Sequence, residues 1–326
     1  MTDRHVNRAR IRRAIPDTVG WGVGLAVVAA AISGLAIWLN AFAVKQVPDA
    51  AVYTTLKNGV AGLVLLAIST RLVRPADLRQ IRRRQGLALT MVGLVGGGVA
   101  FLLFFSGLAM ASAPSAAFIQ KTMFVWVAIL AVPLLGERLG VTQLVALGVL
   151  IAGQALVLPP RNLAWGTGET MILAATLCWA AEVVAVRRFL RAVPTPIVAT
   201  GRLAIGLVAL VGFVAVTGRT AGILALRPEA YGWILLTGLV LAGYVGTWFG
   251  ALKRAPATVV TSILVGGAVI TGGLQTLAKG GPPSVDLVAG YLLIAAAAAA
   301  IAWLTIRAGI AVGTTRTGTT GPALDA

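Results

Sequence analysis

Four ionisable residues interrupt long apolar stretches of this sequence: Lys57, Lys121, Glu182 and Arg202. A charge at the centre of a bilayer costs on the order of 2.5–3.5 kcal/mol on insertion scales, so such residues normally face a wet cavity or a partner. The three cations outnumber the one acid. If Glu182 pairs with one cation, the other two still lack an internal counter-ion, and a carboxylate or phosphate of a ligand would supply one.

A different interpretation of these charges needs no ligand. Long cationic side chains can extend toward a membrane interface while their stems stay in the apolar region. Glu182 lies close to the expected end of its helix. We therefore leave three roles open for Glu182, which are substrate contact, proton coupling and structural pairing.

A second group of residues could complete a small-molecule pocket, since such pockets combine aromatic side chains with a few amides and hydroxyls. Each member also has a simpler interpretation, because Trp and Tyr gather at membrane interfaces and amides and hydroxyls join neighbouring helices. With the four charged residues included, the candidate substrate-binding residues are Lys57, Arg202, Lys121, Glu182, Asn40, Gln120, Trp179, Tyr244, Trp248 and Thr261. The glycine runs at 96–98 and 266–267 are assigned to close helix packing or bending.

The composition places these residues in a membrane protein. The chain is 58% hydrophobic and 11% charged, whereas a soluble domain carries about 25% charged residues. So few ionisable groups cannot cover a water-facing surface, and most of the chain must therefore face something apolar. The net charge of +17 is divided among short basic runs between apolar stretches, which argues against a nucleic-acid partner.

Several kinds of chemistry are excluded by what the sequence lacks. Cys178 is the single cysteine and His5 the single histidine, which excludes an intrachain disulfide and a cysteine or histidine metal cage. The sequence contains no Walker lysine loop, no nucleophile elbow and no paired carboxylates. We therefore expect no cofactor, no metal, no enzymatic activity and no ATP-driven pumping by this chain alone.

The apolar stretches are each about 20 residues long, enough to cross a hydrocarbon core of about 30 Å. They predict an all-α polytopic membrane protein with ten transmembrane helices. The expected helices span residues 20–44, 49–70, 87–110, 114–135, 140–158, 167–187, 195–217, 230–250, 256–277 and 285–306. The first stretch follows a run of arginines, as a secretory signal would, but it is too long and lacks a small-residue cleavage site, which favours an uncleaved helix.

The distribution of cations predicts the orientation, because cytoplasmic loops of membrane proteins are rich in Lys and Arg. With ten helices, most of the 27 Lys and Arg residues fall on the side that carries both termini. We therefore expect a plasma (inner) membrane protein with a basic cytoplasmic arm at 1–19 and a disordered cytoplasmic tail at 307–326. The opposite side holds only Lys45, Arg161, Arg219, Arg227 and Lys279.

The chain also repeats itself at a distance of about 140 residues. The matched pairs are Asn40 with Glu182, Lys57 with Arg202, and Gly-Leu-Val at 93–95 with Gly-Leu-Val at 238–240. The expected repeats are 20–158 and 167–306, joined by a linker at 159–166. Each contains five helices, an odd number, so the second copy is inverted relative to the first, as in many secondary transporters.

The segment PLLGERLGVTQLVALGVLIAGQAL (133–156) places an acid, Glu137, between the fourth helix and a glycine-bearing fifth. With the two five-helix halves, it resembles the EamA-type transporters of the drug/metabolite transporter (DMT) superfamily over residues 20–306. The resemblance implies transport of a small metabolite by alternating access through a central cavity, and it names no substrate. The sequence departs from the family pattern at Lys279, which stands where a counterpart of Glu137 is expected, and in its unusually basic interior.

Together these features predict a secondary transporter, either exporter or exchanger, with a midplane site for a small polar metabolite. The metabolite would be anionic or zwitterionic, such as an amino acid or an organic acid. The expected partners are this metabolite and the lipid bilayer; proton or counter-substrate coupling stays open, as does the oligomeric state. The alternative is a flippase or enzyme for a lipid-linked phosphorylated intermediate, in which the buried cations would hold the phosphate.

The expected topology can be tested by labelling single cysteines in a variant that lacks Cys178. A cysteine that replaces Arg219 should react with a membrane-impermeant maleimide on intact cells, because its loop lies outside. Cysteines that replace Arg82 or Arg254 should react only after permeabilisation. Labelling of residue 82 in intact cells would contradict ten helices with a cytoplasmic N-terminus.

Overall fold

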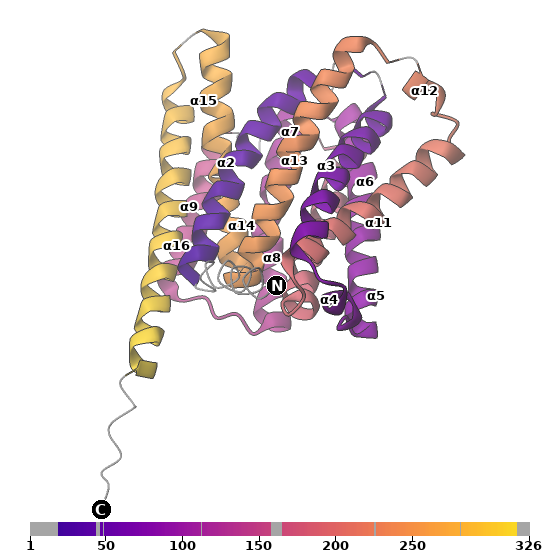
Figure 1. Cartoon of the computed structure of the whole chain (residues 1–326). Coiled ribbons are helices and arrows are strands. Elements are labelled where there is room, and N and C mark those ends of the chain that lie inside the picture. Colours follow the sequence, from indigo (N-terminus) through magenta and orange to yellow (C-terminus); the bar gives the residue numbers. More distant parts are fainter. Residues whose placement is uncertain are drawn as a thin grey trace, which may run out of the picture.

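The computed structural model describes residues 19–43, 46–47, 49–111, 113–157, 165–224, 226–280 and 282–317. All regular structure in these residues is helical (Figure 1). They contain nine helical segments long and apolar enough to cross a membrane, and a tenth apolar helix, Val141–Val157, is shorter. The described part of the chain thus has the ten-helix membrane architecture that the sequence predicts.

The first half consists of α2 (Val19–Ala43), α3 (Ala50–Leu72), α4 (Pro75–Arg79), α5 (Arg83–Met91), the π-helix η1 (Val92–Val99), α6 (Ala100–Met110), α7 (Ala113–Lys121), α8 (Met123–Leu135) and α9 (Val141–Val157). The second half consists of α10 (Thr167–Ala185), the π-helix η3 (Val186–Leu190), α11 (Thr195–Val216), α12 (Ala221–Leu224), α13 (Pro228–Arg254), α14 (Ala257–Val265), α15 (Gly267–Lys279) and α16 (Val285–Thr317). Helices that follow one another without a loop form one membrane span, as in α5–η1–α6, α7–α8, α10–η3 and α14–α15.

Most helix ends lie close to the expected ones, and two differences have a physical reason. The third span begins at Arg83, because the Gln85 side chain accepts a hydrogen bond from the Arg82 amide at 3.0 Å and caps the helix there. The last helix continues to Thr317, past the expected end at 306. No proline interrupts this segment.

Several predictions from the sequence concern residues that the structure does not describe. They concern the basic arm up to residue 18, the tail from residue 318, most of the linker at 159–166, and the cations Lys45 and Arg161. Both ends of the described chain, the start of α2 and the end of α16, lie at the lower end of the bundle in Figure 1.

The fourth and ninth spans are interrupted at equivalent points. Each consists of a 9-residue helix followed by a 13-residue helix, with the break at Thr122 in one and at Gly266 in the other. Each second helix ends at a glycine with positive φ, which is 66° at Gly136 and 69° at Gly280. Only glycine adopts this conformation without strain. The two halves therefore match in structure as well as in sequence.

This match corrects one detail of the sequence comparison. When Gly136 is aligned with Gly280, Lys279 corresponds to Leu135, the last residue of α8, and not to Glu137. The residue at the position of Glu137 is then Gly281, which has no side chain.

The packing between the halves follows a pseudo-twofold relation. α2 packs on α13 as α10 packs on α6, and α3 packs on α13 as α11 packs on η1. α3 and α11 pack on each other, as do α9 and α16, which lie side by side at the left edge of the bundle in Figure 1. The approach of α11 to η1 requires glycine, because a Cβ on Gly206 would lie 2.6 Å from the carbonyl carbon of Gly97.

Glu137 joins the two halves at the lower end of the bundle. One carboxylate oxygen accepts a hydrogen bond from the Ala257 amide at 2.6 Å, and the other accepts from the amide and hydroxyl of Thr258 at 3.1 and 2.7 Å. These amides are the first of α14, which have no partner inside the helix. A carboxylate is favoured there by the exposed donors and by the helix dipole.

The capping role of Glu137 predicts a loss of stability on substitution. Glu137→Ala should lower the free energy of unfolding by about 1.5–3 kcal/mol, the range for hydrogen bonds to a charged group, measured as a lower thermal midpoint in detergent. The matched control is Glu229→Ala, which removes an exposed acid from the first turn of α13 and should change stability by less than about 0.5 kcal/mol. Equal midpoints for the two variants would disprove the cap.

Candidate functional site

Arg202 of α11 and Glu182 of α10 form an ion pair in the interior of the bundle. The Nε of Arg202 donates to Oε1 of Glu182 at 2.5 Å, and its Nη2 donates to Oε2 at 3.2 Å. Both side chains are buried. Two parallel bonds of this kind fix the geometry of both groups as well as neutralising their charge. In this structure, Glu182 is therefore engaged in a structural pair.

The backbone of η1 completes this pair. The carbonyl of Gly96 accepts hydrogen bonds from Nη2 of Arg202 and from Nε1 of Trp179, both at 3.0 Å. A π-helix departs from regular α-helical hydrogen bonding, and such segments often occur at functional sites. Residue 96 must be glycine here, because a Cβ would lie 1.9 Å from Oε2 of Glu182. The run that the sequence assigned to helix packing thus also contacts the charged pair.

Lys57 of α3 lies in a different environment. Its Nζ donates to Oδ1 of Asn40 at 3.2 Å, and Asn40 directs its own Nδ2 to the Ala36 carbonyl at 2.7 Å. The Tyr53 hydroxyl also donates to Oδ1 of Asn40 and lies 3.0 Å from Oγ1 of Thr237. Lys57 is 4% exposed, and within the described residues it has no ion pair. All its polar partners are neutral.

Lys57 and Arg202 occupy equivalent positions in the two halves. A Cβ on Gly238 would lie 3.1 Å from the Lys57 carbonyl, and a Cβ on Gly93 would lie 3.4 Å from the Arg202 carbonyl. The Gly-Leu-Val repeats found in the sequence therefore pack against the helices that carry the two cations. The partners correspond too, since Asn40 precedes Lys57 as Glu182 precedes Arg202, each on the preceding helix.

Aromatic rings on α6 connect the two cations. The Lys57 ammonium lies 5.2 Å from the Phe105 ring centroid, and the Arg202 guanidinium lies 5.4 Å from that of Phe101. The Phe101 and Phe105 rings stack at 6.2 Å, and Trp179 meets Phe101 edge-on at 5.5 Å. Cations over aromatic faces are attracted by the ring quadrupole. One pair of stacked rings thus lies beside both cations.

Two of the aromatic candidates lie on the α13 side of this site. Tyr244 interacts electrostatically with both Arg202 and Glu182. Its ring stacks on Trp248 at a centroid distance of 5.9 Å, and Trp248 is buried. The Tyr244 hydroxyl makes no hydrogen bond to any residue that the structure describes.

Three other candidates make none of the hydrogen bonds or ring contacts described above for this group of residues. Lys121 is the last residue of α7, beside the break at Thr122; it is 8% exposed and makes no hydrogen bond or ion pair with a described residue. Gln120 is half-buried. The Thr261 hydroxyl donates to the Ala257 carbonyl of its own helix at 2.9 Å.

Sequence reasoning missed several members of the site. Tyr53 lies four residues before Lys57, on the same face of α3, and this spacing is a signal that could have identified it. Gly96 and the two phenylalanines gave no such signal, because glycine and phenylalanine are common throughout apolar helices. Thr237 enters the site from α13 through packing that only the structure reveals.

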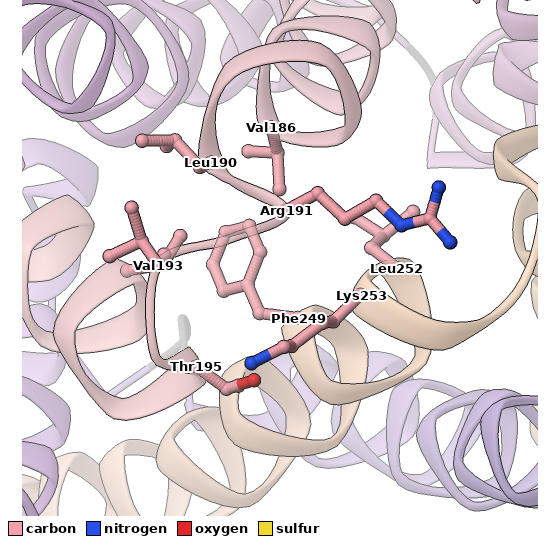
Figure 2. A pocket seen from close by; sticks show the side chains of 9 residues that line it. Val186, Leu190, Arg191, Val193, Thr195, Phe249, Leu252 and Lys253 are labelled. Atoms are coloured by element: carbon pink, nitrogen blue, oxygen red, sulfur yellow. The ribbon is translucent and has the colours of Figure 1, made fainter. Parts of the chain in front are cut away.

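The lower end of the bundle contains a small cavity of about 10 Å³, roughly the space for one water molecule (Figure 2). Its lining consists of Val186, Leu190, Arg191, Val193, Thr195, Val198, Phe249, Leu252 and Lys253. Phe249 also lies 6.0 Å from the Arg202 guanidinium. The Phe249 ring therefore borders the cavity and also lies near the charged pair. The side chains of Arg191 and Lys253 extend in different directions along the rim.

Comparison with known proteins agrees with the two-repeat structure. The model of the EamA-like transporter family matches residues 20–158 and, a second time, residues 166–303. A search of curated proteins finds no match. A solved structure titled "Crystal structure of protein" superposes with a TM-score of 0.68 at 20% sequence identity, covering 89% of this chain and 98% of that chain. This likeness concerns the fold alone.

The buried ion pair predicts an asymmetric response to charge removal. Arg202→Met should lower the free energy of unfolding by about 3–5 kcal/mol, because it leaves a buried carboxylate without a partner. Adding Glu182→Gln removes that unpaired charge and should restore most of the loss, measured as the thermal midpoint in detergent. Lys121→Met is the control, since it removes a buried cation that has no acidic partner among the described residues and should not destabilise. Equal midpoints for the single and double variants would rule out the pair.

Proposed function

Because the chain belongs to the EamA-like transporter family, a family of membrane transporters of the DMT type, we propose that it is a secondary transporter of a small anionic or zwitterionic metabolite. The proposed site contains Lys57, Arg202 and Glu182, with the aromatic side chains around them. The proposed mechanism is alternating access, in which the two inverted halves exchange conformations and expose the site to one side of the membrane at a time.

The observation that carries this proposal is the equivalence of Lys57 and Arg202 in the two halves, with stacked phenyl rings between them. Inverted-repeat transporters bind their substrates near the midplane, at the interface of the repeats. Two cations and one acid leave a net positive charge at this point. An anionic group of a substrate would compensate it, which avoids the cost of an unpaired charge in the membrane.

The interrupted spans support a conformational exchange. α7–α8 and α14–α15 break at equivalent points, and helix breaks within membrane spans are common in transporters. The lower end of the bundle is held by Glu137 and occupied by Phe249. Opening of this end would require α14 to leave Glu137 and Phe249 to move away from Arg202.

The proposed orientation has both termini in the cytoplasm and the chain in the plasma (inner) membrane. The described cations of the lower loops and helix ends support it, since cytoplasmic segments are rich in Lys and Arg. They lie near the end of α3, at the start of α5, after α8, in or after η3, and in α16: Arg71, Arg82, Arg83, Arg84, Arg138, Arg187, Arg188, Arg191 and Arg307.

Counterflow in proteoliposomes tests the proposed function. Liposomes that contain the purified protein and an unlabelled metabolite should accumulate the same radiolabelled metabolite against its total concentration, for at least one compound in a panel of amino acids and organic acids. Protein-free liposomes, and proteoliposomes loaded with buffer alone, are the controls. Chemical conversion of a lipid-linked phosphorylated compound, with no accumulation of any metabolite, would contradict transport and favour the flippase or enzyme alternative.

A further inference from the structure

The two equivalent cations have different partners, and only one of these partners carries a negative charge. Arg202 is paired with a carboxylate, whereas Lys57 has the amide oxygen of Asn40 at the corresponding position. We infer that Lys57 is the residue that binds the negative group of the substrate, and that the substrate is an organic anion without a cationic group. This inference rests on the proposed function and narrows its substrate class.

Lys57 retains the capacity to bind an anion. A lysine ammonium has three donors, and the described residues accept only one of them, at Oδ1 of Asn40. The remaining neighbours are the faces of the Tyr53 and Phe105 rings, at 5.0 and 5.2 Å. These contacts are attractive, but they do not cancel the charge. Two donors and a full positive charge therefore stay available to a ligand.

Asn40 orients the Lys57 ammonium without neutralising its charge. Its Nδ2 donates to the Ala36 carbonyl, which directs Oδ1 toward the ammonium. The Tyr53 hydroxyl occupies the same oxygen and is itself close to Thr237. The ammonium is thereby oriented by neutral groups alone, so it approaches a ligand without first having to leave an acid.

Arg202 is less available. Three of the five guanidinium donors are occupied, two by Glu182 and one by the Gly96 carbonyl. A ligand carboxylate would have to displace Glu182, which would leave a buried anion without a partner. Arg202 and Glu182 therefore act as a positioning pair that fixes α10 and α11 at the site.

The distribution of acids argues against a zwitterion. Glu182 is the only described acid in the interior of a membrane span, because η3 continues its span beyond α10 to Leu190, and both of its oxygens face Arg202. The other described acids lie at or beside helix ends: Asp49, Asp77, Glu137, Glu169, Glu229 and Asp286. A ligand ammonium at Lys57 would meet a like charge and no free carboxylate.

Matched ligand pairs test this inference. We would measure the thermal midpoint of the purified protein with propionate against alanine, 4-methylpentanoate against leucine, 3-phenylpropionate against phenylalanine, and succinate against aspartate. In each pair the second compound adds an ammonium group. At least one carboxylate should stabilise the protein and should bind at least about tenfold more tightly than its amino acid, since an unpaired buried charge is strongly disfavoured.

Variants assign the effect to Lys57. Lys57→Met should weaken carboxylate binding about tenfold to a hundredfold, the loss expected for a charge-assisted hydrogen bond, and Lys57→Arg should retain most of the affinity. The combination of Arg202→Met and Glu182→Gln should cost less than about tenfold, because its net charge is that of the wild type. Arg84→Met removes the same charge from an exposed position at the start of α5 and should leave binding unchanged.

Three results would overturn the inference: stabilisation by none of the carboxylates, binding of an amino acid as tight as that of its carboxylate, or wild-type affinity in Lys57→Met. The proposed function fails in a different way. A carboxylate that binds through Lys57 but is never accumulated in counterflow would refute transport, whereas counterflow of an amino acid would refute only the anion class.

Discussion

The cost of holding a guanidinium inside a membrane governs the centre of this molecule. Arg202 is 7% exposed, and three of its neighbours reduce that cost. Glu182 supplies the counter-charge, η1 supplies a carbonyl, and the Phe101 ring covers a face of the guanidinium. Glycine at 96 is required so that the carboxylate fits against the helix. A carbonyl of the π-helix, Gly96 and the Phe101 ring thus all accommodate one buried charge.

The same backbone arrangement serves a different electrostatic purpose in the other half. Lys57 and Asn40 repeat the positions of Arg202 and Glu182, yet the amide leaves the lysine charge uncompensated. The exchange of a carboxylate for an amide changes the local charge by one unit, and the Asn40 side chain is one methylene shorter than that of Glu182. The two halves are therefore similar in geometry but different in charge. In our proposal, Arg202 positions helices, whereas Lys57 attracts an anion.

The sequence predicted the helices, the repeat and the central charges well, because each depends on local signals. A run of about 20 apolar residues means a membrane span in any context, and a charge within it stands out. The pairing of Asn40 with Glu182 emerged from alignment alone. The contacts of Gly96 with Arg202 and Trp179 could not be predicted, because they depend on a π-helix and on the packing of α10 and α11 against it. Lys121, Gln120 and Thr261 were selected by residue type, and residue type does not fix which way a side chain points.

The cap at Glu137 has a consequence for how the two faces of the protein respond to ligand. Two identical halves would give two end states of equal free energy, but these three hydrogen bonds exist at the lower end, and the aligned residue Gly281 has no side chain to make them. The described contact at the opposite end, between Asp49 and Arg219, is an exposed ion pair, and such pairs contribute about 0–1 kcal/mol. In the proposed transport cycle, these bonds therefore favour the state that is closed at the Glu137 end. Apparent affinity scales with the fraction of molecules that are competent to bind. Ligand that enters from the end opposite Glu137 should therefore half-saturate the site at a lower concentration than ligand that enters from the Glu137 end.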